Sequence, residues 1–185
     1  ISKIKGIKTL TFHQHVKENN FFGKRLLIRH DIDHDLWTAE NMAEIESEYN
    51  LCSTFFVLHT APYFKKNFKE TMNICQNIQS LGHEIGLHND LISDFFINNK
   101  EPKNNLVELL KLFEGEGIAI SGSASHGSPF IQKLNKTLNK KMFIPYTNYF
   151  VFMELLNEVL LNSPDKIQPP DPKFRGRKLS LPYMN

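Results

Sequence analysis

Short apolar runs alternate with segments of helical periodicity along this chain, and this alternation restricts the fold more than any other feature. Strands are predicted where apolar residues follow one another, at residues 26–28, 53–58 and 83–88, and a fourth begins at residues 118–120. Helical spacing of apolar residues marks the segments between and after them, at residues 42–49, 68–78 and 106–113. Parallel strands need a crossover long enough to hold a helix, so this order predicts an α/β fold with a parallel sheet.

Capping signals support the predicted helix boundaries. Asp35 or Thr38 is suited to cap the first helix, because a short polar side chain can accept a hydrogen bond from a free backbone N–H. Gly82 stands where the end of the second helix favours a left-handed residue. Ser128 followed by Pro129 has the chemistry of an N-cap and a first-turn proline, which predicts a further helix.

The size of the chain indicates one globular domain. With 185 residues, of which 41% are hydrophobic, the chain is long enough to bury a core. We expect an α/β domain over residues 1–163 and a proline-rich connector with a C-terminal tail over residues 164–185. The residues expected in the core lie within the predicted strands and are Phe55, Phe56, Leu87 and Ile120.

Composition argues against several classes of partner. A net charge of +2 with scattered lysines predicts no nucleic-acid partner. No run approaches the roughly 20 apolar residues of a membrane span, so we expect no transmembrane segment. The N-terminus lacks the apolar core of a signal peptide, and Cys52 and Cys75 lie far apart. Reduced thiols and a cytoplasmic location are therefore expected.

Aspartate and histidine side chains gather at the ends of the predicted strands. One histidine at a strand end is more often structural, but a set at successive ends favours a shared site. In parallel α/β folds these ends meet at one edge, where ligands bind. Such a set suits a divalent metal, most readily zinc, which also relieves the repulsion between neighbouring carboxylates. The residues concerned are Asp31, Asp33, His59, His88 and His126.

Three ordered motifs resemble a known family. They are "RHDIDH" at residues 29–34, "STFFVL" at residues 53–58 and "GHEIGLH" at residues 82–88. Together they resemble the polysaccharide deacetylase superfamily (NodB homology, carbohydrate esterase family four), in its WbmS-like branch. The resemblance covers residues 29–129 and implies a distorted (β/α) barrel of the NodB-homology type, complete or incomplete in this chain.

The resemblance also implies roles for the two aspartates. In the family motif T-F-D-D-G the first aspartate is a general base and the second binds the metal. By this match Asp31 is the base and Asp33 a ligand, although the two roles can be exchanged. The family motif H-[ST]-x-x-[HS] supplies two ligands, of which His88 matches the first, while Ile92 cannot be the second.

A third ligand and a proton donor have to come from other residues. His126 in "SASHGSP" is expected to complete the metal site, with Asp90 as its competitor. The late family motifs, including the histidine that protonates the leaving group, have no counterpart here. Candidates for that proton are histidines near the strand ends, each of which can equally hold an aspartate in place: His30, His34 and His59.

These features together predict a metal-dependent deacetylase that removes an N-acyl group from an amino sugar in a surface-glycan precursor. The expected cofactor is a divalent metal, most readily zinc, and the expected partner is an acylated amino-sugar or glycan substrate. Another metal hydrolase on a β/α barrel is disfavoured, because such enzymes usually carry His-x-His on the first strand. A non-catalytic glycan-binding relative is favoured by the missing late motifs.

Overall fold

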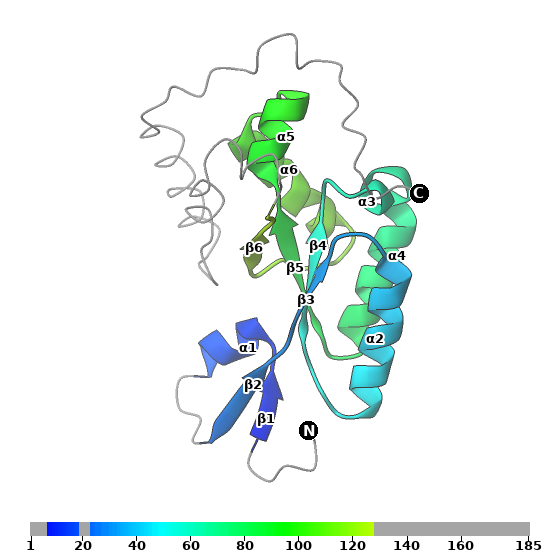
Figure 1. Cartoon of the computed structure of the whole chain (residues 1–185), viewed down its shortest axis with the longest axis vertical. Coiled ribbons are helices and arrows are strands. Elements are labelled where there is room, and N and C mark those ends of the chain that lie inside the picture. Colours follow the sequence, from blue (N-terminus) through cyan, green and yellow to red (C-terminus); the bar gives the residue numbers. More distant parts are fainter. Residues whose placement is uncertain (1–6, 19–22, 128–185) are drawn as a thin grey trace.

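The structure is a computed structural model that describes residues 7–18 and 23–127, and it shows a mixed α/β fold (Figure 1). Its elements in chain order are β1 (Ile7–Leu10), α1 (Phe12–Lys17), β2 (Lys24–Leu27), β3 (Arg29–Ile32), α2 (Leu36–Glu48), β4 (Thr54–Leu58), α3 (Pro62–Lys66), α4 (Phe68–Ser80), β5 (Glu84–Asn89), α5 (Leu91–Asn98), α6 (Pro102–Gly115) and β6 (Ser123–Ser125). Among the described helices, none is both long and apolar enough to cross a membrane.

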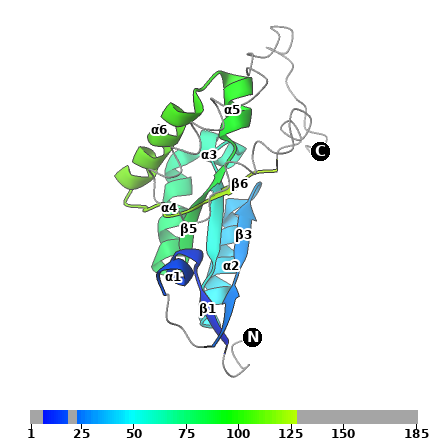
Figure 2. The same cartoon turned by 90° about the vertical axis from the view of Figure 1, so that its left-hand side faces the viewer.

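All described strands pair in parallel, as the sequence predicted. β1 pairs with β2, and β3, β4, β5 and β6 form a second sheet in that order. The second sheet is curled into a half-barrel, which is compatible with an incomplete β/α barrel. Helices α2 and α4 lie side by side against one of its faces (Figures 1 and 2).

Side chains alternate between the two faces of this sheet. Phe55 and Leu87 belong to the core cluster that the strands form with α2 and α4, and neither is more than 1% exposed. Phe56 is also buried, but it points to the opposite face, where its ring occupies the space beside Gly86. The core prediction is thus confirmed for these three phenylalanine and leucine residues. Ile120 is only partly buried at the edge of the cluster, which corrects its placement in the core.

Two predicted strands differ from the observed ones. The apolar run at residues 26–28 ends in β2, and a separate strand, β3, carries the motif that follows it. The two strands are separated at Ile28, whose carbonyl accepts a hydrogen bond from the backbone N–H of Thr54 at 3.0 Å. The fourth strand was predicted to begin at Ile118, but it is β6, whose pairing with β5 begins at Ser123, while Ile118 is buried in the core before it.

The helix signals in the sequence were informative. Asp35 caps α2 by accepting hydrogen bonds from the backbone N–H groups of Trp37 and Thr38, and Gly82 adopts φ +92° directly after α4. The sequence analysis missed the short helices α1, α3 and α5. The helix predicted to begin at Ser128 and the boundary at residues 163 and 164 lie outside the described residues.

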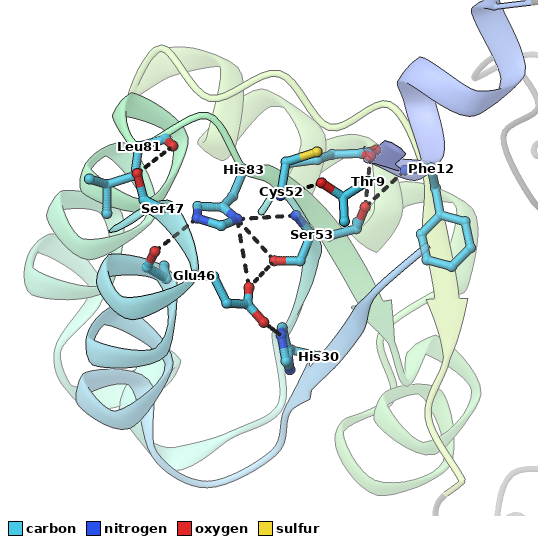
Figure 3. Close-up of polar contacts among 12 residues, drawn as sticks. Thr9, Phe12, His30, Glu46, Ser47, Cys52, Ser53, Leu81 and His83 are labelled. Atoms are coloured by element: carbon cyan, nitrogen blue, oxygen red, sulfur yellow. Dashed lines mark hydrogen bonds and ion pairs between the residues drawn. The ribbon is translucent and has the colours of Figure 1, made fainter. Parts of the chain in front are cut away.

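A buried polar network joins α2 to the sheet (Figure 3). Nε2–H of His83 donates to the carbonyl of Ala43 at 2.9 Å, and Nδ1 accepts from the backbone N–H of Ser53 at 3.1 Å. Glu46 of α2 accepts from the Ser53 hydroxyl at 2.6 Å and pairs with Nε2 of His30 at 2.8 Å. Because Nδ1 of His83 acts as an acceptor, the network requires this imidazole to be neutral.

Replacing Phe56 with alanine should lower the free energy of unfolding by about 3–5 kcal/mol, because a fully buried aromatic ring leaves a cavity. Urea denaturation measures this change. Ile45→Ala is the matched control, since Ile45 is 56% exposed on α2, and a surface change of this kind costs less than about 0.5 kcal/mol. Equal stability of the two variants would contradict the assignment of Phe56 to a packed strand.

Acidification should destabilise the fold through its buried histidines. Burial lowers the pKa of His83 below its usual value, and it lowers the pKa of His59 to about 4. The unfolded chain therefore binds more protons than the folded one below a pH of about 6.5. Stability present above that pH is lost as the pH falls toward the folded pKa values, at up to about 1.4 kcal/mol per pH unit for each group.

Urea denaturation at a series of pH values between about 7.5 and 5 tests this. The variant His83→Gln should start from a lower stability but show a shallower dependence on pH than the wild type. A wild-type free energy of unfolding that stays constant over this interval would contradict the prediction, because it would mean that the folded and unfolded chains bind the same number of protons.

Candidate metal centre

Asp33, His88 and His126 converge at the carboxyl ends of the parallel strands. Each offers one ligand atom, and these three atoms all lie within 4.8 Å of one another. Oδ1 of Asp33 lies 3.4 Å from Nε2 of His88 and 3.9 Å from Nε2 of His126. In the part of the chain that the structure describes, this is the one group of three such residues. The structure thus brings together the three residues that the sequence analysis selected as ligands.

The strand order explains this convergence. Asp33 lies in the bend that follows β3, and His88 belongs to β5, where it is buried. β6 pairs with β5 so that His88 stands opposite Ala124. The backbone N–H of His126 then donates to the carbonyl of Asn89 at 2.9 Å, which extends the pairing to the residue that carries the third side chain.

A hydrogen bond on one ring nitrogen of His88 leaves the other nitrogen able to bind a metal. Its Nδ1–H donates to the carbonyl of Ala124 at 3.0 Å, so the lone pair is on Nε2, which faces Asp33. Burial lowers the pKa of His88, although the charges of Asp31 and Asp33 oppose this shift. His88 is therefore neutral near pH 7, the state in which an imidazole binds a metal.

His126 has a different environment. Its ring lies edge-on to that of His88, with centroids 5.1 Å apart, and its Nδ1 is 3.3 Å from Oδ2 of Asp90. Burial disfavours the charged imidazole, but the hydrogen bond and charge of Asp90 and the charges of Asp33 and Asp31 raise the pKa of His126. Carboxylates therefore make this end of the sheet attractive to a cation.

The environment of Oδ1 of Asp33 is the most direct evidence that the site fits a metal. This oxygen is buried between the two imidazole rings, and no hydrogen-bond donor among the described residues reaches it. A buried carboxylate oxygen without a donor is costly unless a cation satisfies it. One carboxylate oxygen and two imidazole nitrogens form a donor set that zinc accepts.

Asp31 lies beside this group without belonging to it. Its Oδ2 is 3.8 Å from Nε2 of His88, and its carboxylate receives two hydrogen bonds from Arg29, at 2.7 and 2.8 Å. The guanidinium of Arg29 also lies over the ring of Phe56, 5.2 Å from its centroid. The sequence analysis missed Arg29, although its spacing of two from Asp31 places both side chains on the same face of a strand.

The three histidines that were expected to supply a proton occupy different positions. His30 projects from the opposite face of β3 and pairs with Glu46 of α2 (Figure 3), which corrects the expectation that it lies at the strand-end site. His34 is exposed in the bend that also carries Asp33. His59 is buried at 4% exposure, where the charges of Asp94 and Asp90 partly offset the effect of burial on its pKa.

Comparisons with models of protein families, with curated proteins and with solved structures find no match to this chain. The likeness to the polysaccharide deacetylases therefore depends on the three sequence motifs.

Proposed function

We propose that this chain is a metal-dependent deacetylase that removes an N-acyl group from an amino sugar in a glycan precursor. The observation that carries the proposal is the convergence of Asp33, His88 and His126 at one edge of a parallel sheet, with Asp31 beside them. A metal site next to a separate carboxylate provides both requirements of amide hydrolysis: polarisation of the carbonyl, and a base for the attacking water.

Asp33, His88 and His126 would hold the metal. The buried, unsatisfied Oδ1 of Asp33 and the Nε2 lone pair of His88 support this assignment. When bound, a divalent ion supplies Lewis-acid activation of water and of the acyl carbonyl. Three protein ligands are typical of catalytic rather than structural zinc sites, because they leave a coordination position open.

Asp31 would accept the proton of the attacking water. Its carboxylate stands on the same face of β3 as Arg29, which fixes its orientation through two hydrogen bonds. The water oxygen bonds to the acyl carbon, the carbon–nitrogen bond breaks, and the amine leaves with one added proton. His34, exposed in the bend that also carries Asp33, is the candidate donor of that proton.

A non-catalytic glycan-binding relative is the second candidate. The observation that favours it is the Arg29–Asp31 pair, because two hydrogen bonds from one guanidinium engage both oxygens of the proposed base. Each of these oxygens then has only one remaining lone pair with which to accept a proton from water. Measurements of metal binding and of turnover separate the two candidates.

Removing any one of the three proposed ligands should abolish tight binding of zinc. We expect the wild type to bind one Zn²⁺ per chain, and Asp33→Asn and His88→Gln to bind it more than about 100-fold more weakly, since changes outside the ligand set already cost about 10–100-fold. Competition with a chromogenic chelator measures these affinities. His15→Gln on α1 is the control and should bind like the wild type. Unchanged affinity in both ligand variants would show that the site is wrongly assigned.

Asp31→Asn should keep the metal but lose about 10²–10⁴-fold in turnover, because an amide cannot accept the proton of water. Asp33→Asn should lose turnover together with the metal. Release of acetate or formate from N-acylated amino sugars measures the activity of both. Reversed phenotypes would exchange the two roles. A wild type that binds Zn²⁺ and glycans but releases no acyl group would support the non-catalytic relative.

A further inference from the structure

The carboxylate of Asp90 lies directly behind the ring of His126. Oδ2 of Asp90 is 3.3 Å from Nδ1 of His126, on the side of the imidazole that faces away from Asp33. Asp90 is only 5% exposed, and its oxygen is not part of the group that Asp33, His88 and His126 form. The second nitrogen of His126, Nε2, is the one that points toward Asp33.

Neighbouring groups hold this carboxylate in position. The Ser93 hydroxyl donates to Oδ1, and the Thr60 hydroxyl donates to Oδ2 at 3.4 Å. Asp90 also stands at the start of α5, where its carbonyl accepts the backbone N–H of Asp94 at 3.0 Å. The carboxylate of Asp90 is therefore oriented by one side chain that follows β4 and one from α5.

We propose that Asp90 is a positioning residue for the metal site and not one of its ligands. Because its carboxylate oxygen lies 3.3 Å from Nδ1 of His126, Asp90 favours the tautomer with the proton on Nδ1, whose Nε2 lone pair faces Asp33. The same requirement is met for His88 by the carbonyl of Ala124. A neutral imidazole carries one proton, so its position on Nδ1 decides which nitrogen can bind a metal.

Charge supports the same assignment. Arg29 pairs with Asp31 and balances its charge. The carboxylates of Asp33 and Asp90 are then left to balance the two positive charges of a divalent metal. A carboxylate behind an imidazole also makes that imidazole a stronger donor to a cation. The inference rests on the proposed metal site, and it assigns to Asp90 the part of that site that the sequence left open.

Zinc affinity tests the proposal without any measurement of turnover. Asp90→Ala should bind Zn²⁺ about 10–100-fold more weakly than the wild type, as expected when a group outside the ligand set is removed. Asp90→Asn, which keeps size and an acceptor oxygen but loses the charge, should show a smaller loss. Asp94→Asn is the matched control, because Asp94 is equally buried on α5 but bonds to Asn98 and Asn105.

X-ray absorption of the zinc-loaded variants separates positioning from ligation. Asp90→Ala should keep the number of protein ligands of the wild type. Loss of one oxygen ligand in this variant would overturn the proposal and make Asp90 a ligand, and an affinity for Zn²⁺ within about twofold of the wild type would overturn it as well.

Nitrogen NMR of His126 in the metal-free protein gives an independent readout. We expect the Nδ1–H tautomer in the wild type above the pKa of His126 and a mixture of tautomers in Asp90→Ala, with Asp90→Asn resembling the wild type. The opposite tautomer in the wild type would overturn the positioning role. A wild type that binds no Zn²⁺ but shows this change of tautomer would refute the proposed function and leave the contact between Asp90 and His126 established.

Discussion

The parallel register of β3, β4, β5 and β6 is the constraint on which the candidate site depends. Ile32, Val57, Leu87 and Ser123 form one row across the four strands. Asp33 and His88 each follow this row by one residue, so they lie at the same level of the sheet although 55 positions separate them. A slip of one residue in the β4–β5 pairing would turn His88 into the helix-covered face and bring Leu87 to the site.

Because side chains alternate along β3, its two faces contact different parts of the protein. Asp31 faces the strand-end site, while its neighbour His30 stacks on Phe55 and joins the buried network of Glu46 and His83 on α2. Near the other end of the sheet, Glu84 accepts hydrogen bonds from the backbone N–H of His13 and from two hydroxyl groups. Several polar residues of the sequence motifs therefore stabilise helix packing, although the motifs alone would suggest a catalytic role for them.

The sequence predicted the parallel α/β class and the main helices, because these depend on periodicity. The polarity of the strand ends gave the set of aspartates and histidines from which the resemblance selected Asp33 and His88 as ligands, and His126 was inferred to complete them. The sequence did not predict the break between β2 and β3 at Ile28, since a strand that continues and one that breaks show the same apolar run. The placement of His30 failed for a related reason: a short strand without a strict polar alternation does not reveal which face each residue occupies. The role of Asp90 depends on a side-chain contact across two strands, which spacing along the chain does not encode.

The Arg29–Asp31 pair bears on whether the proposed base can act. Both side chains are about one-third exposed, at 36% and 34%, so water screens their attraction. Exposed ion pairs of this kind contribute only about 0.2–1 kcal/mol, and a guanidinium over an aromatic ring adds about 0.5–1 kcal/mol at such sites. Each oxygen of Asp31 keeps a second lone pair for the proton of water, and even the loss of one hydrogen bond would cost little compared with the several kcal/mol that a general base contributes to turnover. The pair orients the carboxylate of Asp31 without preventing it from accepting a proton, and Phe56 and Arg29 together connect the packed interior of the sheet to the residue on which the proposed chemistry depends.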